Sequence, residues 1–410
     1  MQGFAALGQL IGVRLLTEIL PPAVFGEFSL WLGVILLAAV GLANPTMQAM
    51  FRYYPEYALQ GKGSIVMVVA RQQIFKLIKW TTPAFVAGVY LAVAFKWTDL
   101  IILVLLAALV IVEIIRLQYV TMLNAKRYHR LSGIWAIAEA WGRPIVAWVL
   151  VGILGVSIVS VLVGFLLASM IVLVIVWRFI PHEKNVYFST SEEHNLAHRF
   201  WRYSLPLLPL GIIGWIAGMG DRYMIGLLLS PADVGLYVAI YGLASRPMLI
   251  FGTIIESTIR PVYLCALVEG NHHQALNYLK KWMLLIVSGS FLAIVLAWVS
   301  HQWLANILLG DQYRSVSYLL PWIVGGYALL NVSYIANRVC YANEATKSIF
   351  FIELSGAIVA VVAGFIFIKW DGLRGAAAAI PFYYGVQLIL AFYLARDWLK
   401  KSRNSVVEQP

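Results

Sequence analysis

The chain has 410 residues, of which 61% are hydrophobic and only 12% are charged. Because soluble domains carry about a quarter charged residues, this composition excludes an ordinary soluble protein and indicates a multi-pass membrane protein. The net charge of +11 does not indicate a nucleic-acid partner, since the Lys and Arg residues are scattered over short loops rather than gathered in one domain.

Apolar runs of about 20 residues recur along the chain, and each is long enough to cross a hydrocarbon core of about 30 Å as a helix. We therefore predict an all-α polytopic membrane protein. Its twelve transmembrane helices are expected at residues 2-19, 25-44, 77-96, 100-122, 133-153, 156-177, 204-229, 234-259, 282-303, 316-337, 349-369 and 375-395.

The connections between these spans alternate in charge. Every second connection, together with the C-terminal segment, holds 21 of the 30 Lys and Arg residues, whereas the others hold only Lys96, Arg314, Lys369 and Arg374. Cytoplasmic loops are enriched in Lys and Arg. The sequence thus predicts a cytoplasmic membrane protein with both termini in the cytoplasm.

An internal repeat divides the chain. "RLLTEILPPAVFGEF" (14-28) aligns with "RYMIGLLLSPADVGLY" (222-237) when one inserted residue is allowed, so that Arg14 matches Arg222 and Gly26 matches Gly235. Two halves of six helices in the same sense indicate parallel repeats. We expect an N-terminal lobe (1-180), a cytoplasmic linker (181-202), a C-terminal lobe (203-397) and a cytoplasmic tail (398-410).

The linker predicts an amphipathic helix that lies in the membrane interface, with Phe200, Trp201 and Tyr203 at the level of the lipid headgroups. A flexible tether between the lobes is the alternative interpretation, and the sequence does not decide between them.

Five arginines fall inside predicted spans, where a charge costs several kcal/mol and usually faces a cavity or a partner: Arg14, Arg116, Arg143, Arg222 and Arg246. Glu113 and Arg116 are three residues apart, and Glu139 and Arg143 are four apart, so each pair shares one helix face and is able to form a salt bridge. The sequence leaves two interpretations of these pairs: salt bridges that only hold helices together, and pairs with a role in function.

Arg143 and Arg246 each precede a proline, in "WGRPIV" and "SRPML". Proline removes a backbone donor and loosens the carbonyl four residues earlier. Helices bent in this way often line a transport path, because water or a ligand satisfies the freed groups there. The alternative is that each arginine caps the loosened carbonyls of its own bundle.

Asp221 has no acidic partner in the repeat, where Val13 takes its place. A carboxylate beside an arginine is able to bind and release a proton or a sodium ion. It also fits a permanently ionised counter-ion of Arg222 or Arg14, which is the interpretation that we favour.

No motif in the sequence indicates an enzyme. There is no Gly-rich phosphate loop, and neither the histidines nor Cys265 and Cys340 have the spacing of metal ligands. We expect no cofactor and no metal. A membrane glycosyltransferase or polymerase is disfavoured by short outer connections.

The segment "YSLPLLPLGIIGWIAGMGDRYMIGLLLSPADVGLYVAIYGLA" (203-244) resembles the start of the second lobe in polysaccharide transporters and lipid-linked oligosaccharide flippases. These proteins belong to the multidrug/oligosaccharidyl-lipid/polysaccharide (MOP) exporter superfamily. The resemblance rests on Leu205-Pro206, Trp215, Asp221-Arg222 and Gly235-Leu236-Tyr237. "VFGEFSL" in the first half and "GLRGAAAA" (372-379) fit the same pattern.

This resemblance implies two six-helix lobes forming a V around a central cavity that opens alternately to each side. It also implies transport of a polyprenyl-diphosphate-linked oligosaccharide, the precursor of a surface polysaccharide such as the O-antigen of lipopolysaccharide. Arginine matches the oxygens of a diphosphate, so the candidate cavity residues are Arg14, Arg52, Arg143, Arg222 and Arg246. Candidate groups for coupling to H⁺ or Na⁺ are Asp221, Glu139 and Glu113.

The expected partners are therefore the lipid-linked oligosaccharide, the lipid bilayer and other polysaccharide assembly proteins. Two rival functions remain besides the membrane enzyme. A drug or cation antiporter of the same superfamily would favour an acidic, aromatic cavity rather than arginines in the spans. A scaffold of a glycan assembly complex would use its buried charges only to clamp helices.

Overall fold

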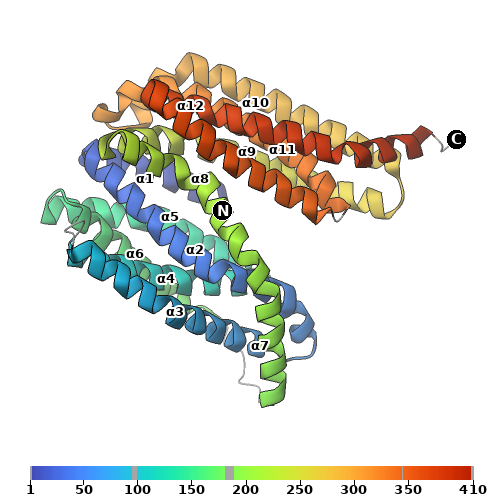
Figure 1. The fold of residues 1–410 in the computed structure, drawn as a ribbon, viewed down its shortest axis with the longest axis horizontal. Helices are drawn as coiled ribbons and strands as arrows, with labels where there is room; N and C mark the ends of the chain where they lie inside the picture. Colours follow the sequence, from blue (N-terminus) through green and yellow to red (C-terminus); the bar gives the residue numbers. More distant parts are fainter. Residues whose placement is uncertain (1, 95–98, 181–188, 344, 408–410) are drawn as a thin grey trace. The chain divides into compact units, whose positions relative to one another are not determined.

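The computed structural model describes residues 2–94, 99–180, 189–343 and 345–407, and these residues form an all-α fold (Figure 1). The first helices are α1 (Gln2–Ile19), α2 (Pro22–Leu59), α3 (Gly63–Ala94), α4 (Leu100–Ala125), α5 (His129–Leu154) and α6 (Ile158–Trp177). They are followed by α7 (Thr190–Ser204), the short 3₁₀ helix η1 (Leu205–Leu207) and α8 (Leu208–Leu228). The last are α9 (Pro231–Val268), α10 (His272–Leu308), the 3₁₀ helix η2 (Asp311–Leu319), α11 (Leu320–Ala342) and α12 (Thr346–Val407).

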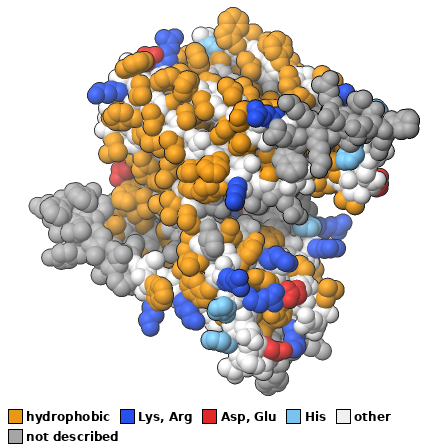
Figure 2. All heavy atoms as spheres, turned by 45° about the vertical axis from the view of Figure 1, so that its right-hand side comes forward, with side chains coloured by type: hydrophobic (Ala, Val, Ile, Leu, Met, Phe, Trp, Pro, Cys, Tyr) orange, Lys and Arg blue, Asp and Glu red, His pale blue; other side chains and the backbone are white. Residues whose placement is uncertain are grey.

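The twelve predicted spans overlap helices in the described part of the chain, although span 77-96 runs past the end of α3 at Ala94 and span 204-229 includes η1. The last two lie in α12, which is interrupted by the non-helical residues Asp371 and Gly372, the latter with φ of 53°. Glycine adopts a positive φ without steric cost, so it allows the chain to turn between two helical segments. By length and composition, eight helices among the described residues qualify as membrane spans, and α12 counts as one of them. Hydrophobic side chains cover much of the face drawn in Figure 2.

The chain divides into two compact units. Unit 1 comprises Met1–Leu20 and Glu27–Trp215, and unit 2 comprises Pro21–Gly26 and Ile216–Pro410. Unit 1 has an apolar cluster that includes Met50, Ile65, Leu123, Trp135 and Phe200. Unit 2 has its own cluster on α9 to α12, helices that run side by side in Figure 1. Residues 181–188 of the predicted linker, Lys96 and residues 408–410 of the predicted tail lie outside the described residues.

The predicted helix of the linker forms as α7, but it packs on protein. The N-cap Ser189 accepts a hydrogen bond from Glu192 N at 3.2 Å. Phe200 is fully buried in the cluster of unit 1 and its ring lies 5.5 Å from that of Tyr53. The expectation that Phe200 lies at the lipid headgroups is therefore wrong, because this side chain completes the protein core.

Ion pairs hold α7 against the loop and helices beneath it. Lys62 Nζ lies 2.5 Å from Glu192 Oε1. Arg199 forms a bidentate ion pair with Glu56, with both N–O distances at 3.0 Å. These contacts bind residues 190–204 to unit 1, which excludes a loose tether for this part of the linker.

The repeat-related glycines Gly26 and Gly235 meet inside unit 2. A Cβ at Gly26 would collide with Pro231 O and would lie 2.7 Å from Gly235 N. A Cβ at Gly235 would collide with Pro22 O and would lie 3.0 Å from Gly26 N. The first turns of α2 and α9 thus approach backbone to backbone, as small residues allow in membrane helix packing.

We expect Gly26→Ala to destabilise the protein by about 1–3 kcal/mol, because an added methyl group has no space between two backbones. Gly152→Ala on α5 is the matched control. Its Cβ would meet no atom within 4 Å, so it should leave stability unchanged or raise it by roughly 0.5–1 kcal/mol through helix propensity. Thermal unfolding in detergent measures both variants, and equal midpoints would contradict the close contact.

The attachment of α7 should depend on pH. The hydrogen bond from Arg199 lowers the pKa of Glu56, and that from Lys62 lowers the pKa of Glu192, in both cases from an ordinary value of 4.5. A carboxyl group whose pKa is lowered by folding stabilises the folded form above its ordinary pKa, and this contribution is lost as the pH falls through the lowered value. We expect α7 to loosen only below about pH 4.5.

Hydrogen exchange of residues 190–204, corrected for the intrinsic rate at each pH, measures this loosening. At pH 7, Arg199→Gln should raise the exchange of α7, whereas Arg202→Gln should not, because Arg202 is exposed on the same helix and forms no ion pair with the residues that the structure describes. Exchange that is independent of both pH and Arg199 would show that the apolar contact of Phe200 alone holds the helix.

Candidate functional site

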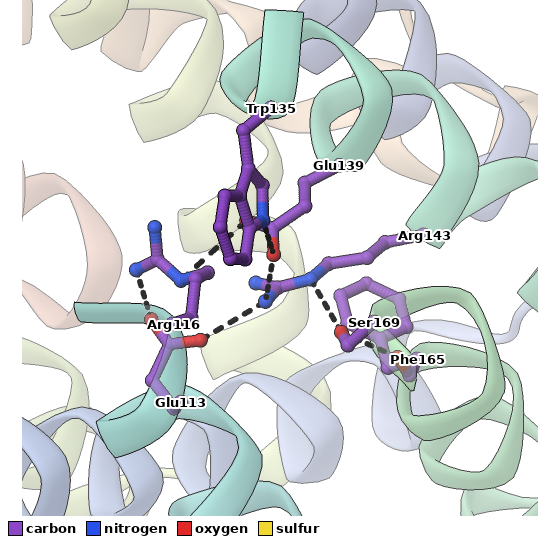
Figure 3. Close-up of polar contacts among 7 residues, drawn as sticks. All are labelled: Glu113, Arg116, Trp135, Glu139, Arg143, Phe165 and Ser169. Atoms are coloured by element: carbon purple, nitrogen blue, oxygen red, sulfur yellow. Dashed lines mark hydrogen bonds and ion pairs between the residues drawn. The ribbon is translucent and has the colours of Figure 1, made fainter. Parts of the chain in front are cut away.

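Buried charges in unit 1 gather into one network on α4 and α5 (Figure 3). Arg116 contacts Glu113 within α4 and lies 3.5 Å from Glu139 on α5. Arg143 reaches Glu113 at 2.9 Å and Glu139 at 3.3 Å. The two predicted pairs within helices form, and each arginine also bridges to the other helix.

Neutral groups complete this network. Trp135 Nε1 donates to Glu139 at 3.0 Å, and Arg143 Nε donates to Ser169 Oγ on α6 at 2.9 Å. Ser169 in turn donates to Phe165 O at 2.7 Å. Two arginines and two glutamates give zero formal charge, so the network links three helices without leaving a net charge in the apolar interior.

The space beside Arg143 is small. A cavity of about 30 Å³ is lined by Arg143, Glu113 and Ser169 together with apolar residues of α2, α4 and α6. This volume holds about one water molecule. This space leaves no room for a diphosphate beside Arg143, and the assignment of Arg143 to a transport cavity stays a prediction.

The remaining predicted arginines of unit 1 lie apart from this network. Arg14 pairs with Glu18 one turn later on α1, at 2.8 Å. Arg52 is exposed on α2 with its guanidinium 5.9 Å from the centre of the Tyr53 ring. The sequence interpretation did not include Glu18, although its spacing of four residues from Arg14 is the signal that finds it.

Asp221 in unit 2 binds a tyrosine. Its Oδ2 accepts a hydrogen bond from Tyr237 Oη at 2.6 Å, and its Oδ1 accepts one from the backbone N of Arg222 at 2.8 Å. Among the described residues, no ion pair joins the side chains of Asp221 and Arg222. The interpretation of Asp221 as a counter-ion of Arg222 or Arg14 stays a prediction, because the hydrogen bonds of its carboxylate go to the Tyr237 hydroxyl and to the backbone of Arg222.

Arg222 lies against an aromatic ring and a thioether. Its guanidinium is 5.1 Å from the centre of the Tyr241 ring and contacts Met219 Sδ. Its Nε is buried and has no hydrogen-bond partner in the part of the chain that the structure describes. Arg246 lies on α9 of the same unit and is partly buried.

A chain of tyrosines continues from this point. Tyr241 Oη and Tyr327 Oη are 2.6 Å apart, and the rings of Tyr327 and Tyr384 are 5.6 Å apart. The sequence interpretation missed Tyr241, Tyr327 and Tyr384, because aromatic residues in apolar helices give no signal that separates a polar cluster from lipid contact.

Removal of one charge from the network of unit 1 should destabilise the protein. We expect Arg143→Gln and Glu113→Gln each to lower stability by about 3–5 kcal/mol, because each leaves an uncompensated buried charge. The double variant should be more stable than the sum of the two single losses predicts, since it restores neutrality. Thermal unfolding as a double-mutant cycle measures this coupling, and additive losses would show that the 2.9 Å pair contributes nothing.

Comparison with solved structures places this fold. An inward-facing multidrug resistance MATE family transporter of the MOP superfamily superimposes with a TM-score of 0.73 and 15% identity, covering 100% of this chain and 96% of that one. The lipid II flippase MurJ in an inward closed conformation superimposes with a TM-score of 0.70 and 16% identity, covering 99% and 89%. The fold is thus that of multi-pass membrane transporters.

No curated protein matches the sequence. A family model does match it, over residues 80–318, and this model describes polysaccharide biosynthesis proteins. The matched segment extends from α3 through both halves of the repeat to η2, which is more than half of the chain. This chain therefore belongs to the polysaccharide biosynthesis protein family, and it has the fold of MOP superfamily transporters.

Proposed function

We propose that this protein is a flippase that carries a polyprenyl-diphosphate-linked oligosaccharide, the precursor of a surface polysaccharide, across the cytoplasmic membrane. Membership of a polysaccharide biosynthesis family supports a substrate that carries a glycan. The transporter fold supports transport of this substrate rather than catalysis. One of the solved structures of this fold is a lipid II flippase. The proposed topology has two six-helix lobes in parallel repeat, a V-shaped central cavity and both termini in the cytoplasm.

The observation that carries the proposal is the state of Arg222. This arginine lies in an apolar helix, its buried Nε lacks a hydrogen-bond partner among the described residues, and no described carboxylate forms an ion pair with it. A diphosphate would supply the missing negative charge and the missing acceptor. The planar guanidinium matches two phosphate oxygens at once, which makes such hydrogen bonds stronger than neutral ones.

The five candidate arginines then take different roles. Arg222 and Arg246 would bind the diphosphate, because each is a cation within an apolar helix of unit 2. Arg143 would instead hold α4, α5 and α6 together, since both glutamates already neutralise it. Arg14 and Arg52 would attract the anionic headgroup on its way, as Arg14 is half-exposed beside Glu18 and Arg52 is exposed.

Alternating access would move the substrate, with the two lobes rocking so that the cavity opens to one side at a time. Asp221 is our candidate for coupling to H⁺ or Na⁺, because its carboxylate binds Tyr237 rather than a cation. Glu113 and Glu139 are less suited to this role, since both are locked in ion pairs with two arginines.

A drug or cation antiporter is the second candidate function. It is supported by the superposition on a multidrug resistance transporter with the TM-score of 0.73. An organic cation would be repelled by Arg222 and Arg246, so we place this function after the flippase.

Replacement of Arg222 tests the flippase. In liposomes with a lipid-linked oligosaccharide in one leaflet, we expect Arg222→Gln to slow its appearance in the other leaflet at least about tenfold, because a hydrogen bond to a charged group contributes about 1.5–3 kcal/mol. Arg222→Lys should retain part of the flipping rate, since lysine keeps the positive charge but lacks the planar guanidinium that binds two phosphate oxygens. Arg178→Gln, at an exposed arginine after α6, is the matched control.

Wild-type protein that fails to flip the glycolipid but exports ethidium would refute the flippase and favour the antiporter. Full flipping by Arg222→Gln would remove this arginine from the substrate site.

Coupling has its own test. A pH or sodium gradient should accelerate flipping by wild-type protein, and Asp221→Asn should abolish this dependence because the amide does not ionise. Persistence of the gradient effect in Asp221→Asn would exclude Asp221 as the coupling group.

A further inference from the structure

Unit 2 contains a cavity of about 370 Å³ that lies apart from Arg222, between α9, α10, α11 and α12. Small-molecule sites have volumes of about 300–1,000 Å³, so this space is large enough for an organic ligand. Polar side chains converge on it from three helices: Glu256 from α9, Asn331 and Arg338 from α11, and Glu353 from α12. Trp282 on α10 forms an apolar wall.

One of its two carboxylates is already neutralised. Arg338 Nε lies 2.6 Å from Glu256 Oε1, and Arg338 donates to the second oxygen at 3.2 Å. Arg260 adds a further pair with Glu256 at 3.2 Å. The charge of Glu256 is thus neutralised by arginines, and Arg338 Nη2 donates to it.

The other carboxylate has no such partner. Glu353 accepts a hydrogen bond of 3.4 Å from Asn337 Nδ2, and it forms no ion pair among the described residues. Asn337 is 2% exposed, and its own Oδ1 lacks a partner in the same part of the chain. The two glutamates and the two arginines of this group, Glu256, Glu353, Arg338 and Arg260, sum to zero formal charge, so the cavity has no excess positive charge to attract a phosphate or another anion.

Acceptors dominate the remaining polar groups. Asn331, which is 3% exposed, donates Nδ2 to Met248 O at 2.9 Å and turns its Oδ1 toward Gly252. The hydroxyl of Thr253 donates to Leu249 O at 2.8 Å. The cavity therefore offers acceptors on Glu353 and Asn331, and it matches a ligand rich in hydrogen-bond donors.

A cation is a poorer match than an uncharged ligand. The Arg338 guanidinium lies 5.7 Å from the centre of the Tyr334 ring and 5.2 Å from that of Tyr341, so a protein cation already lies over one face of each ring. No group of three metal-ligating side chains occurs among the residues that the structure describes. An uncharged, hydroxyl-rich ligand satisfies the acceptors and avoids repulsion from Arg338.

We propose that this cavity is a sugar-binding subsite that takes one or more glycosyl residues of the transported lipid-linked oligosaccharide, with Glu353 and Asn331 accepting hydrogen bonds from sugar hydroxyls. The proposal rests on the proposed flippase function. Arg246 and Glu256 are ten residues apart on α9, about 15 Å along the helix. A short glycan spans this length, so the diphosphate and the glycan would be bound in separate parts of unit 2.

Binding to purified protein in detergent tests the subsite with two probes: undecaprenyl diphosphate without sugar, and undecaprenyl diphosphate carrying a short oligosaccharide. Wild-type protein should bind the glycosylated probe more tightly. Glu353→Gln and Asn331→Leu should each lower the affinity for the glycosylated probe about tenfold, which equals about 1.4 kcal/mol. The affinity for the sugar-free probe should stay unchanged. Glu269→Gln, at an exposed glutamate at the end of α9, is the matched control and should affect neither probe.

The outcomes separate the two proposals. If wild-type protein binds neither probe, the flippase function fails. If it binds both and Glu353→Gln retains the full preference for the glycosylated probe, the subsite is refuted while the flippase stands. Binding of tetraphenylphosphonium that is lost in Glu353→Gln would show that the cavity takes organic cations instead. Unchanged affinity for the sugar-free probe confirms that each variant is folded.

Discussion

The ion-pair network of Glu113, Arg116, Glu139 and Arg143 sets the packing of unit 1. A charged side chain at the centre of a membrane helix costs about 2.5–3.5 kcal/mol on insertion scales, so four of them are compatible with hydrocarbon only when they neutralise one another. Neutralisation requires α4 and α5 at a fixed register, because each arginine reaches a glutamate on both helices. The hydrogen bond from Arg143 to Ser169 extends this constraint to α6.

Unit 2 treats buried charge differently. Arg222 is covered by the Tyr241 ring rather than by a carboxylate, and Asp221 binds a hydroxyl rather than a cation. These contacts are weaker than ion pairs, so a ligand replaces them at lower cost. The same logic applies to Glu353, which faces a cavity without an ion pair among the described residues. Unit 2 thus holds Arg222 and Glu353 without an ion pair among the described residues, beside Glu256, which pairs with Arg338 and Arg260.

Hydropathy located the long apolar helices, because apolar length determines where a chain is able to cross hydrocarbon, whereas α7 was predicted from its amphipathic pattern. The charged pairs at three and four residues were also predictable, since helix geometry places them on one face. The bridges between Arg143 and Glu113 and between Arg116 and Glu139 were not, because they depend on how two helices pack. Glu256 and Glu353 lie inside the predicted spans 234-259 and 349-369. As acidic residues within membrane spans they were predictable candidates, but the sequence interpretation selected mainly arginines. The burial of Phe200 depended on α7 docking, which composition does not reveal.

The repeat clarifies the role of Asp221. Its counterpart in the first half is Val13, and the counterpart of its partner Tyr237 is Phe28. Both are buried apolar residues, and Phe28 packs on Phe165 with ring centres 4.7 Å apart. The first half thus lacks the acid and the hydroxyl together, yet it keeps the arginine as Arg14, which pairs with Glu18 instead. An arginine at this position does not require an acid immediately before it. Asp221 and Tyr237 are therefore a hydrogen-bonded pair specific to the second half, and this asymmetry is the reason why we propose Asp221 as the coupling group.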